Sequence, residues 1–197
     1  MPSTSTDATD ATDADEALMA RVAVGDHVAF AQLVASHLPR AYGIARRVLR
    51  QQADAEDAAQ EAFTRLWTHA HQWQAGRCGF STWFYRIVVN ASLDHARRQR
   101  SRQEILDGEA LLAELLDPQA DLHSSAAQAR EAAALHGAVQ RLPAQQRMAV
   151  VLCYIEEHSN PQAAQLMGLH VKALEGLLGR ARKQLRGWLG RLQQEDL

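Results

Sequence analysis

The chain has 197 residues, is 47% hydrophobic and 22% charged, and carries a formal net charge of −2. These values are ordinary for a soluble globular protein with one medium or two small domains. The longest apolar run, at 148–155, is far too short to cross a bilayer, so membrane insertion is excluded, and the sparse Pro and Gly favour an all-α fold.

The first residues lack a basic stretch followed by an apolar core, so we expect no signal peptide. The chain has two cysteines, Cys78 and Cys153, and no CxxC pair. This favours a reducing cytoplasm, although the sequence alone leaves a disulfide between them open.

The net charge averages over very unequal segments. Residues 79–102 hold five arginines and one aspartate, and residues 170–191 hold six basic residues and one glutamate. Residues 1–20 hold five acids and residues 103–122 hold six, with no base in either segment. Two basic segments separated by an acidic one indicate a nucleic-acid partner despite the balanced total.

The first predicted elements lie within residues 15–102, which we interpret as one helical domain. Residues 1–14 are a low-complexity acidic tail that we expect to be disordered. Helical patterning starts near Asp15, and a further helix is predicted over 54–67, with Asp54 as its N-cap. One side of this second helix is apolar, and the other is a contiguous polar stripe of Asp57, Gln60, Glu61 and Thr64.

A loop at 72–80 precedes a helix predicted over 81–102 and capped by Ser81. One face of this helix should belong to the core, formed by Phe84, Ile87, Val88, Ala91 and His95. A second stripe contains Trp83, Arg86, Asn90, Asp94 and Arg97. Aromatic rings stack on bases, amides read base edges and arginines hold phosphates, so this stripe could bind DNA. The alternative is a tryptophan at the core rim followed by a solvated basic helix end.

Residues 103–130 are predicted to be an acidic linker with a short helix at 109–116, and residues 131–192 a second helical domain. Leu142-Pro143 should end one helix and start another. Asn160-Pro161 should do the same, as cap and first position.

Residues 160–179 have the spacing of a DNA-binding helix-turn-helix. Ala164 is small enough for the helix crossing, Gly168 follows where the turn can need a positive φ, and Leu174 packs the second helix onto the first. The last helix should start near His170. Its apolar face is Leu174, Leu177, Leu178, Ala181 and Leu185. The alternative is a helical hairpin with a solvated basic face.

Three stretches together resemble a bacterial extracytoplasmic-function (ECF) RNA polymerase sigma factor of the sigma-70 family. They are "DAEDAAQEAFTRLW", "FSTWFYRIVVNASLDHARRQR" and "LPAQQRMAVVLCYIEEHSNPQAAQLMGLHVKALEGLLGRARKQLR". The resemblance covers about residues 15–100 and 131–188. It implies regions 2 and 4 of a short sigma factor, which binds core RNA polymerase, recognises promoter DNA and assists its melting, and which carries out no catalysis of its own.

The resemblance also implies roles for individual residues. Contacts to the β′ clamp helices of polymerase fall to Asp54, Asp57, Gln60 and Glu61. Reading and opening of the minus-ten element fall to Trp83, Arg86, Asn90, Arg97 and Arg98. Recognition of the minus-thirty-five element falls to His170, Lys172, Glu175, Arg180, Lys183 and Arg186, in a domain that also touches the β flap.

Other implied features concern regulation and promoter choice. An anti-sigma factor is an expected partner, and the acidic linker would run towards the RNA exit path. Glu175, Gly176 and Leu177 depart from the family pattern, since Lys, Ser and Arg are frequent at these places. The promoter sequence therefore does not follow from the resemblance.

Two other classes of protein are alternatives to this interpretation. A ligand-sensing helix-turn-helix regulator would need a pocket, and no convergent polar cluster indicates one. A zinc enzyme would have to use His69, His71 and Cys78, a weak set without a fourth ligand, and no phosphate loop or nucleophile motif is present. We therefore expect no metal, no cofactor and no enzymatic activity.

Overall fold

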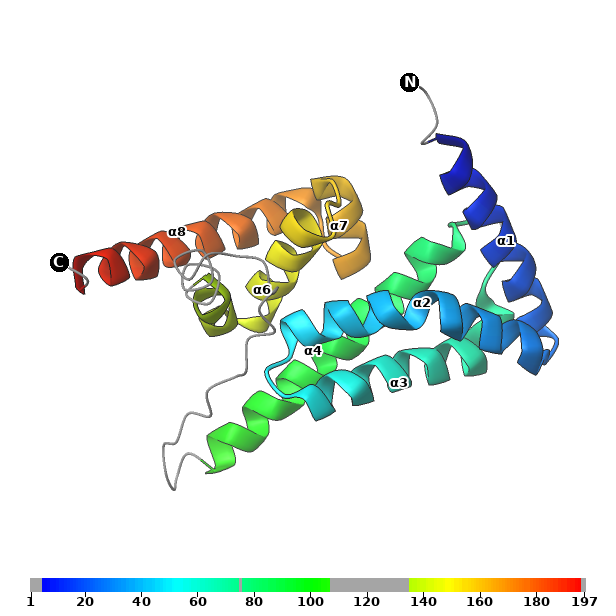
Figure 1. Ribbon diagram of the computed structural model, residues 1–197, viewed down its shortest axis with the longest axis horizontal. Coiled ribbons are helices and arrows are strands. Elements are labelled where there is room, and N and C mark those ends of the chain that lie inside the picture. The colour runs from blue at the N-terminus through cyan, green and yellow to red at the C-terminus, as the bar shows by residue number, and fades with distance from the viewer. Residues whose placement is uncertain (1–4, 75, 107–134, 196–197) are drawn as a thin grey trace, which may run out of the picture. The chain divides into compact units, whose positions relative to one another are not determined.

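The computed structural model describes residues 5–74, 76–106 and 135–195. Every regular element in these ranges is helical, which confirms the all-α prediction. The described residues form two compact units, one built mainly from the helices before His95 and the other from those after residue 135 (Figure 1). Within the described ranges, no helix is both long and apolar enough to cross a membrane. The predicted linker lies outside the described residues, except for its first four.

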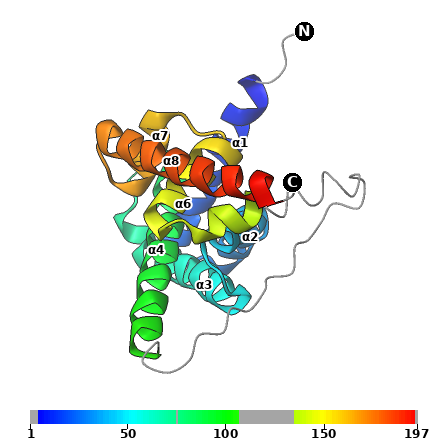
Figure 2. The same ribbon diagram turned by 90° about the vertical axis from the view of Figure 1, so that its left-hand side faces the viewer.

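The first unit consists of four helices and one short 3₁₀ turn. In chain order these are α1 (Ser5–Ala23), α2 (His27–Val48), α3 (Gln52–His69), η1 (Ala70–Gln72) and α4 (Phe80–Leu106). Helices α2 and α3 lie side by side, and α1 packs on α2 and η1 (Figures 1 and 2). The largest fully buried side chains of this unit include Met19, Leu33, Ile44, Leu66, Phe80 and Phe84.

Asp26 is the N-cap of α2. Its carboxylate accepts hydrogen bonds from the backbone N–H groups of Val28 and Ala29, at 2.8 and 3.1 Å, and pairs with Arg21 at 2.7 Å. The bond from Ala29 lowers the pKa of Asp26, with the Arg21 bond as the next cause. A lowered pKa in the folded state means that this cap stabilises above the unfolded pKa of about 3.9 and is lost as the pH falls through the lowered value.

Three predicted starts in this unit are corrected by the structure. Helix α3 begins at Gln52, so Asp54 lies in its first turn, where a carboxylate favours the helix dipole, and is not the N-cap. Helix α4 begins at Phe80, so Ser81 is inside it. Helix α1 begins at Ser5, within the segment expected to be disordered; alanine, the best helix former, recurs through that segment.

The second unit contains a helical segment at 135–141 followed by four labelled elements. These are α6 (Ala144–Val150), the π-helical turn η2 (Val151–Ile155), α7 (Asn160–Met167) and α8 (Val171–Glu195). Helix α8 packs against α6 (Figure 2). Pro143 is the N-cap of α6, as the Leu142-Pro143 boundary predicted.

Helix α7 starts one position differently from the prediction. Asn160 is its first residue, and the preceding Ser159 forms a reciprocal cap with Gln162. The Ser159 N–H donates to Gln162 Oε1 at 3.0 Å, and the Gln162 N–H reaches Ser159 Oγ at 3.5 Å. The Ser-x-x-Gln pattern of a capping box, at 159–162, is the sequence signal for this start, and Asn160 is not the cap.

The turn between α7 and α8 has the predicted geometry. Gly168 has φ +64°, and the Leu169 N–H donates to the Ala164 carbonyl at 2.8 Å, which closes the end of α7. The side chains that hold the two helices together are fully or nearly fully buried: Ala163, Ala164, Leu166, Leu174, Leu178 and Ala181. The helix-turn-helix prediction is therefore confirmed at the level of the fold.

A buried arginine that the sequence analysis did not single out joins the first two helical segments of this unit. Arg147 on α6 is only 4% exposed. It donates to Gln140 Oε1 at 2.7 Å, to the Gln140 carbonyl at 2.7 Å and to the Leu142 carbonyl at 2.8 Å. These carbonyls lie where the 135–141 helix ends and its own hydrogen-bond ladder stops, so Arg147 replaces the missing donors.

Both cysteines are free thiols, so the disulfide that the sequence left open does not form. Burial raises the pKa of Cys153, whose sulfur lies 3.8 Å from Asn160 Oδ1.

Candidate nucleic-acid and protein interfaces

Helix α4 separates a core side from a polar side. Of the predicted core face, Phe84, Val88 and Ala91 are buried, whereas Ile87 and His95 are half-buried. Tyr85 and Val89, which the prediction did not include, are also buried.

On the polar side, Arg86 and Asn90 are exposed and Trp83 is half-buried. The stripe continues into exposed Arg97 and Arg98. The structure thus brings the five predicted minus-ten residues onto solvent-accessible positions of one helix. Their contact with DNA stays a prediction.

The helix start is set by the loop before it. Gly76 in this loop has φ +82°, a conformation that side chains other than glycine rarely adopt. The loop ends at Gly79, whose carbonyl accepts from the Trp83 N–H at 3.2 Å. Trp83 is therefore held in the first turn of α4, directly after this loop.

The polar stripe of α3 divides into two parts. Asp57 and Gln60 are exposed, and Asp54 is half-buried. Glu61 instead bonds to Arg65 on its own helix and to His95 Nε2 of α4 at 2.8 Å. Arg65 also lies 3.5 Å from Asp94 of α4. Glu61 therefore helps to join α3 to α4, which the sequence could not show because its partner is 34 residues away.

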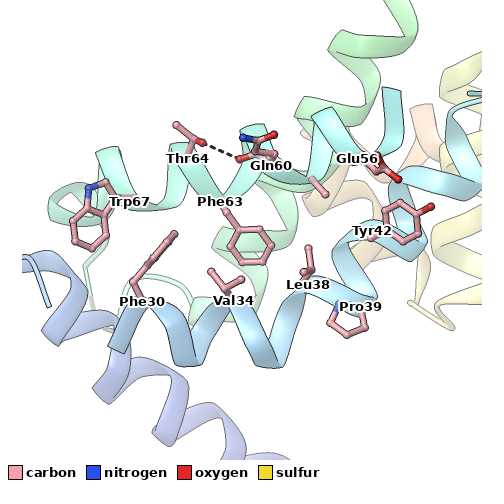
Figure 3. Close-up of a pocket in the computed structure, with 11 residues that line it drawn as sticks. Phe30, Val34, Leu38, Pro39, Tyr42, Glu56, Gln60, Phe63, Thr64 and Trp67 are labelled. Carbon is pink, nitrogen blue, oxygen red and sulfur yellow. Dashed lines mark hydrogen bonds between the residues drawn. The ribbon is translucent and has the colours of Figure 1, made fainter. Parts of the chain in front are cut away.

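An apolar groove of about 770 Å³ runs between α2 and α3 (Figure 3). Phe30, Val34 and Leu38 point into it from α2, facing Phe63 and Trp67 of α3. The remaining lining residues are Pro39, Tyr42, Glu56, Ala59, Gln60 and Thr64. Gln60 thus belongs to both the groove and the exposed part of the polar stripe.

Contacts between aromatic rings hold Trp67 in place at one end of the groove. His27 stacks on Trp67 with ring centroids 4.6 Å apart, and Phe30 meets Trp67 edge-on at 5.1 Å. Leu38 remains 42% exposed. This groove was not predicted, although apolar residues at every fourth position of 30–42 indicate that α2 has more apolar surface than the core requires.

Helix α8 presents the predicted minus-thirty-five residues to solvent. Its exposed residues include Lys172, Glu175, Arg180, Lys183 and Arg186, and His170 is exposed just before its start. The opposite face is buried by Leu174, Leu177, Leu178 and Ala181. A Cβ added at Gly179 would meet no atom within 4 Å, so packing within the chain does not require this glycine. An absent side chain there leaves the helix backbone open to close approach.

The candidate zinc ligands His69, His71 and Cys78 do not form a cluster that could hold a metal ion. The His69 ring bonds to the Arg65 carbonyl at 3.0 Å. Among the described residues there is no group of three or more histidine, cysteine, aspartate or glutamate side chains that could hold a metal ion.

Two family models match this chain in order. Residues 33–102 match sigma-70 region 2, and residues 132–185 match sigma-70 region 4. The first match spans α3, the loop and α4, and the second spans the helix-turn-helix.

Individual relatives cover most of the chain. It is 36% identical over 179 residues to the ECF RNA polymerase sigma factor SigE of Mycolicibacterium smegmatis, covering 88% of this chain and 67% of SigE. It is 35% identical over 180 residues to the ECF RNA polymerase sigma factor SigM of Mycobacterium tuberculosis, covering 90% of this chain and 85% of SigM. The solved structure of CnrH in complex with the cytosolic domain of CnrY has a TM-score of 0.62 and 30% identity, covering 91% of this chain and 99% of CnrH.

Proposed function

Because this chain belongs to the ECF sigma factors of the sigma-70 family, we propose that its two units divide promoter recognition between α4 and α8 and bind polymerase through α3. The chain is a sigma factor that directs core RNA polymerase to promoters. The family is not catalytic in general, and we infer that this chain performs no chemical step of its own and acts in the cytoplasm, where polymerase and promoter DNA are found.

The observation that carries the proposal is the arrangement of the first unit. An exposed acidic and amide surface on α3 lies next to a half-buried tryptophan with an exposed arginine and asparagine on α4, and both helices belong to one compact unit. An acidic protein surface suits a basic partner, whereas the α4 stripe suits a nucleic acid. One small unit can therefore bind polymerase and DNA at the same time.

Polymerase binding is tested best at Asp57. The Asp57→Lys variant should weaken binding to core polymerase about tenfold or more, because a like charge would face a basic partner surface. Asp57→Asn should have a smaller effect. Glu61 is unsuitable for this test, since reversing its charge would also break its bonds to Arg65 and His95.

The measurement is affinity for core polymerase at several salt concentrations, with helix content checked by circular dichroism. Glu157→Lys, at an exposed glutamate of the second unit, is the matched charge-reversal control. Equal affinities for the wild type and Asp57→Lys would remove α3 from the polymerase interface.

DNA binding by α8 is tested by three substitutions that should behave differently. Lys183→Ala and Arg186→Ala should each weaken promoter binding evenly across sequences and lower the salt slope by about one, if these residues hold phosphates. Lys172→Ala should instead change sequence preference in the minus-thirty-five element. Binding is measured with the holoenzyme, and Arg141→Ala, at an exposed arginine outside α8, is the control. If all three α8 variants match this control, α8 is not the recognition helix.

Regulation is expected to come from a separate protein of the anti-sigma type. The apolar groove between α2 and α3 is a surface where such a protein could bind, because large apolar side chains line it and Leu38 is partly exposed. A protein seated there would also cover Gln60 on the proposed polymerase surface.

A further inference from the structure

A histidine near the centre of the first unit joins three helices and is not used by any function described above. His37 lies on α2. Its Nε2 is 2.9 Å from Asp15 Oδ2 on α1, and its Nδ1 is 3.1 Å from Tyr85 Oη on α4. The His37 side chain is only 12% exposed and Asp15 16% exposed, so water competes little for these bonds.

Aromatic rings fix the position of this histidine. The His37 ring meets Phe80, Phe84 and Tyr85 edge-on, with centroids 5.2, 5.8 and 5.9 Å away. Phe80 and Phe84 stack on one another at 5.7 Å, and the Arg40 guanidinium lies 4.5 Å from the centre of the Tyr85 ring. Asp15 from α1, Arg40 from α2 and Tyr85 from α4 are therefore the charged or titratable groups of this cluster.

The partners determine the direction of the hydrogen bonds. An ionised carboxylate only accepts, so the bond to Asp15 places a proton on Nε2. In a neutral ring, Nδ1 then accepts from the Tyr85 hydroxyl. With Asp15 ionised and the His37 ring neutral, Tyr85 donates to His37 and His37 donates to Asp15.

This series of hydrogen bonds ends at Tyr85, on the side of α4 opposite to Trp83. Phe80, Phe84 and Tyr85 all lie in the first two turns of α4, and Tyr85 is two residues from Trp83. Two residues are about 200° of rotation in an α-helix, so the Tyr85 and Trp83 side chains leave α4 on opposite sides. The contact with His37 holds Tyr85 on the core side of α4. It therefore also fixes the direction in which the Trp83 side chain leaves the helix.

We propose that His37 is a positioning residue for promoter opening, which holds the start of α4 through Tyr85 and ties it to α1 through Asp15. This rests on the proposed role of Trp83 in capturing a base. A side chain that is already held in its binding orientation loses less conformational freedom when the base arrives, so more of the stacking energy goes into strand opening. His37 itself does not touch DNA in this scheme.

The experiment compares His37→Ala, His37→Gln and Tyr85→Phe in the full chain assembled with core polymerase. The glutamine amide carries an NH₂ group that can donate to Asp15 and a carbonyl oxygen that can accept from Tyr85, whereas alanine offers neither. Opening is measured on a duplex promoter and on the same promoter mismatched across the minus-ten bubble. We expect His37→Ala to reduce opening of the duplex about fivefold, the scale of losing a side-chain hydrogen bond, and to act normally on the mismatched promoter. His37→Gln should recover most of the loss, and Tyr85→Phe should resemble His37→Ala.

Asp26→Ala is the matched control for a simple loss of stability. It removes the cap of α2 in the same unit without touching α4, so it should lower the melting temperature but leave opening unchanged. If His37→Ala opens the duplex as the wild type does, or if His37→Gln is no better than His37→Ala, the positioning role is wrong. It is also wrong if His37→Ala is equally impaired on both promoters.

Trp83→Ala separates this inference from the proposed function beneath it. Normal opening by Trp83→Ala would contradict the proposed function and the positioning role together. Impaired opening by Trp83→Ala, with normal opening by His37→Ala and Tyr85→Phe, would contradict the positioning role alone.

Discussion

Replacing Trp83 or Asn90 by alanine is expected to reduce opening of the minus-ten element tenfold or more, with a smaller effect on initial closed binding. Stacking a base on an aromatic ring contributes about 1–3 kcal/mol, and flipping a base out of the duplex costs a few kcal/mol. Losing one contact of this size shifts the opening equilibrium about tenfold, since about 1.4 kcal/mol is a factor of ten. Binding of polymerase to the still-closed duplex should change less, because we propose that α8 supplies most of that contact.

The measurement is transcription and strand opening on a duplex promoter and on one mismatched across the minus-ten bubble. Asn90 is exposed, so its truncation should leave the fold intact, but Trp83 is half-buried and its variant needs a thermal melt beside it. Trp83→Phe keeps an aromatic face and should retain most of the activity. If both alanine variants fold and bind polymerase normally but the mismatched promoter restores neither, this face of α4 does not drive opening.

The second large effect is expected at Arg147, which stabilises the second unit rather than touching DNA. Arg147→Leu should cost about 3 kcal/mol or more of folding free energy, because leaving a buried acceptor without its donor costs about 1–3 kcal/mol and three acceptors are affected. Replacing both partners of a hydrogen bond by apolar groups can be nearly neutral, but here two acceptors are backbone carbonyls, of Gln140 and Leu142. No side-chain substitution removes those carbonyls, so they would stay buried without this donor.

Hydrogen exchange of the backbone amides of α6 and α8, followed in the full chain at increasing urea concentration, measures this loss. Arg141→Leu, six positions earlier and exposed, is the matched control and should exchange at nearly the wild-type rate. Dependence of transcription on the minus-thirty-five element should fall with the Arg147 variant only. An unchanged exchange rate would mean that the hydrogen bonds of Arg147 contribute nothing to folding.

Local sequence patterns were enough to predict the parts of this protein that depend on neighbours along the chain. The turn at Gly168 and the buried face of α8 follow from glycine conformation and helical periodicity, and both are confirmed. Helix starts were less predictable, because several polar residues near one helix end can each act as its cap. Ser159 and not Asn160 caps α7, and neither Asp54 nor Ser81 serves as a cap.

Features that depend on distant residues could not be predicted. The partner of Glu61 is His95 on another helix, and the partners of His37 come from α1 and α4. The apolar groove exists only because α2 and α3 lie side by side with large side chains facing one another. Periodicity identifies an apolar face, but it does not show whether a neighbouring helix fills that face or leaves it open.

The shared position of Gln60 has a quantitative consequence for the cell. A protein in the groove and polymerase on α3 would need the same side chain, so the two would bind by mutual exclusion. An inhibitor present at a free concentration of about a hundred times its dissociation constant would then weaken the apparent polymerase affinity about a hundredfold. The rate of transcription from the promoters of this sigma factor would then depend on the ratio of inhibitor to sigma factor. When the inhibitor binds tightly, transcription would begin once the amount of sigma factor exceeds the amount of inhibitor. Under such titration, destroying a modest fraction of the inhibitor would release transcription sharply, without any change in the shape of the sigma factor.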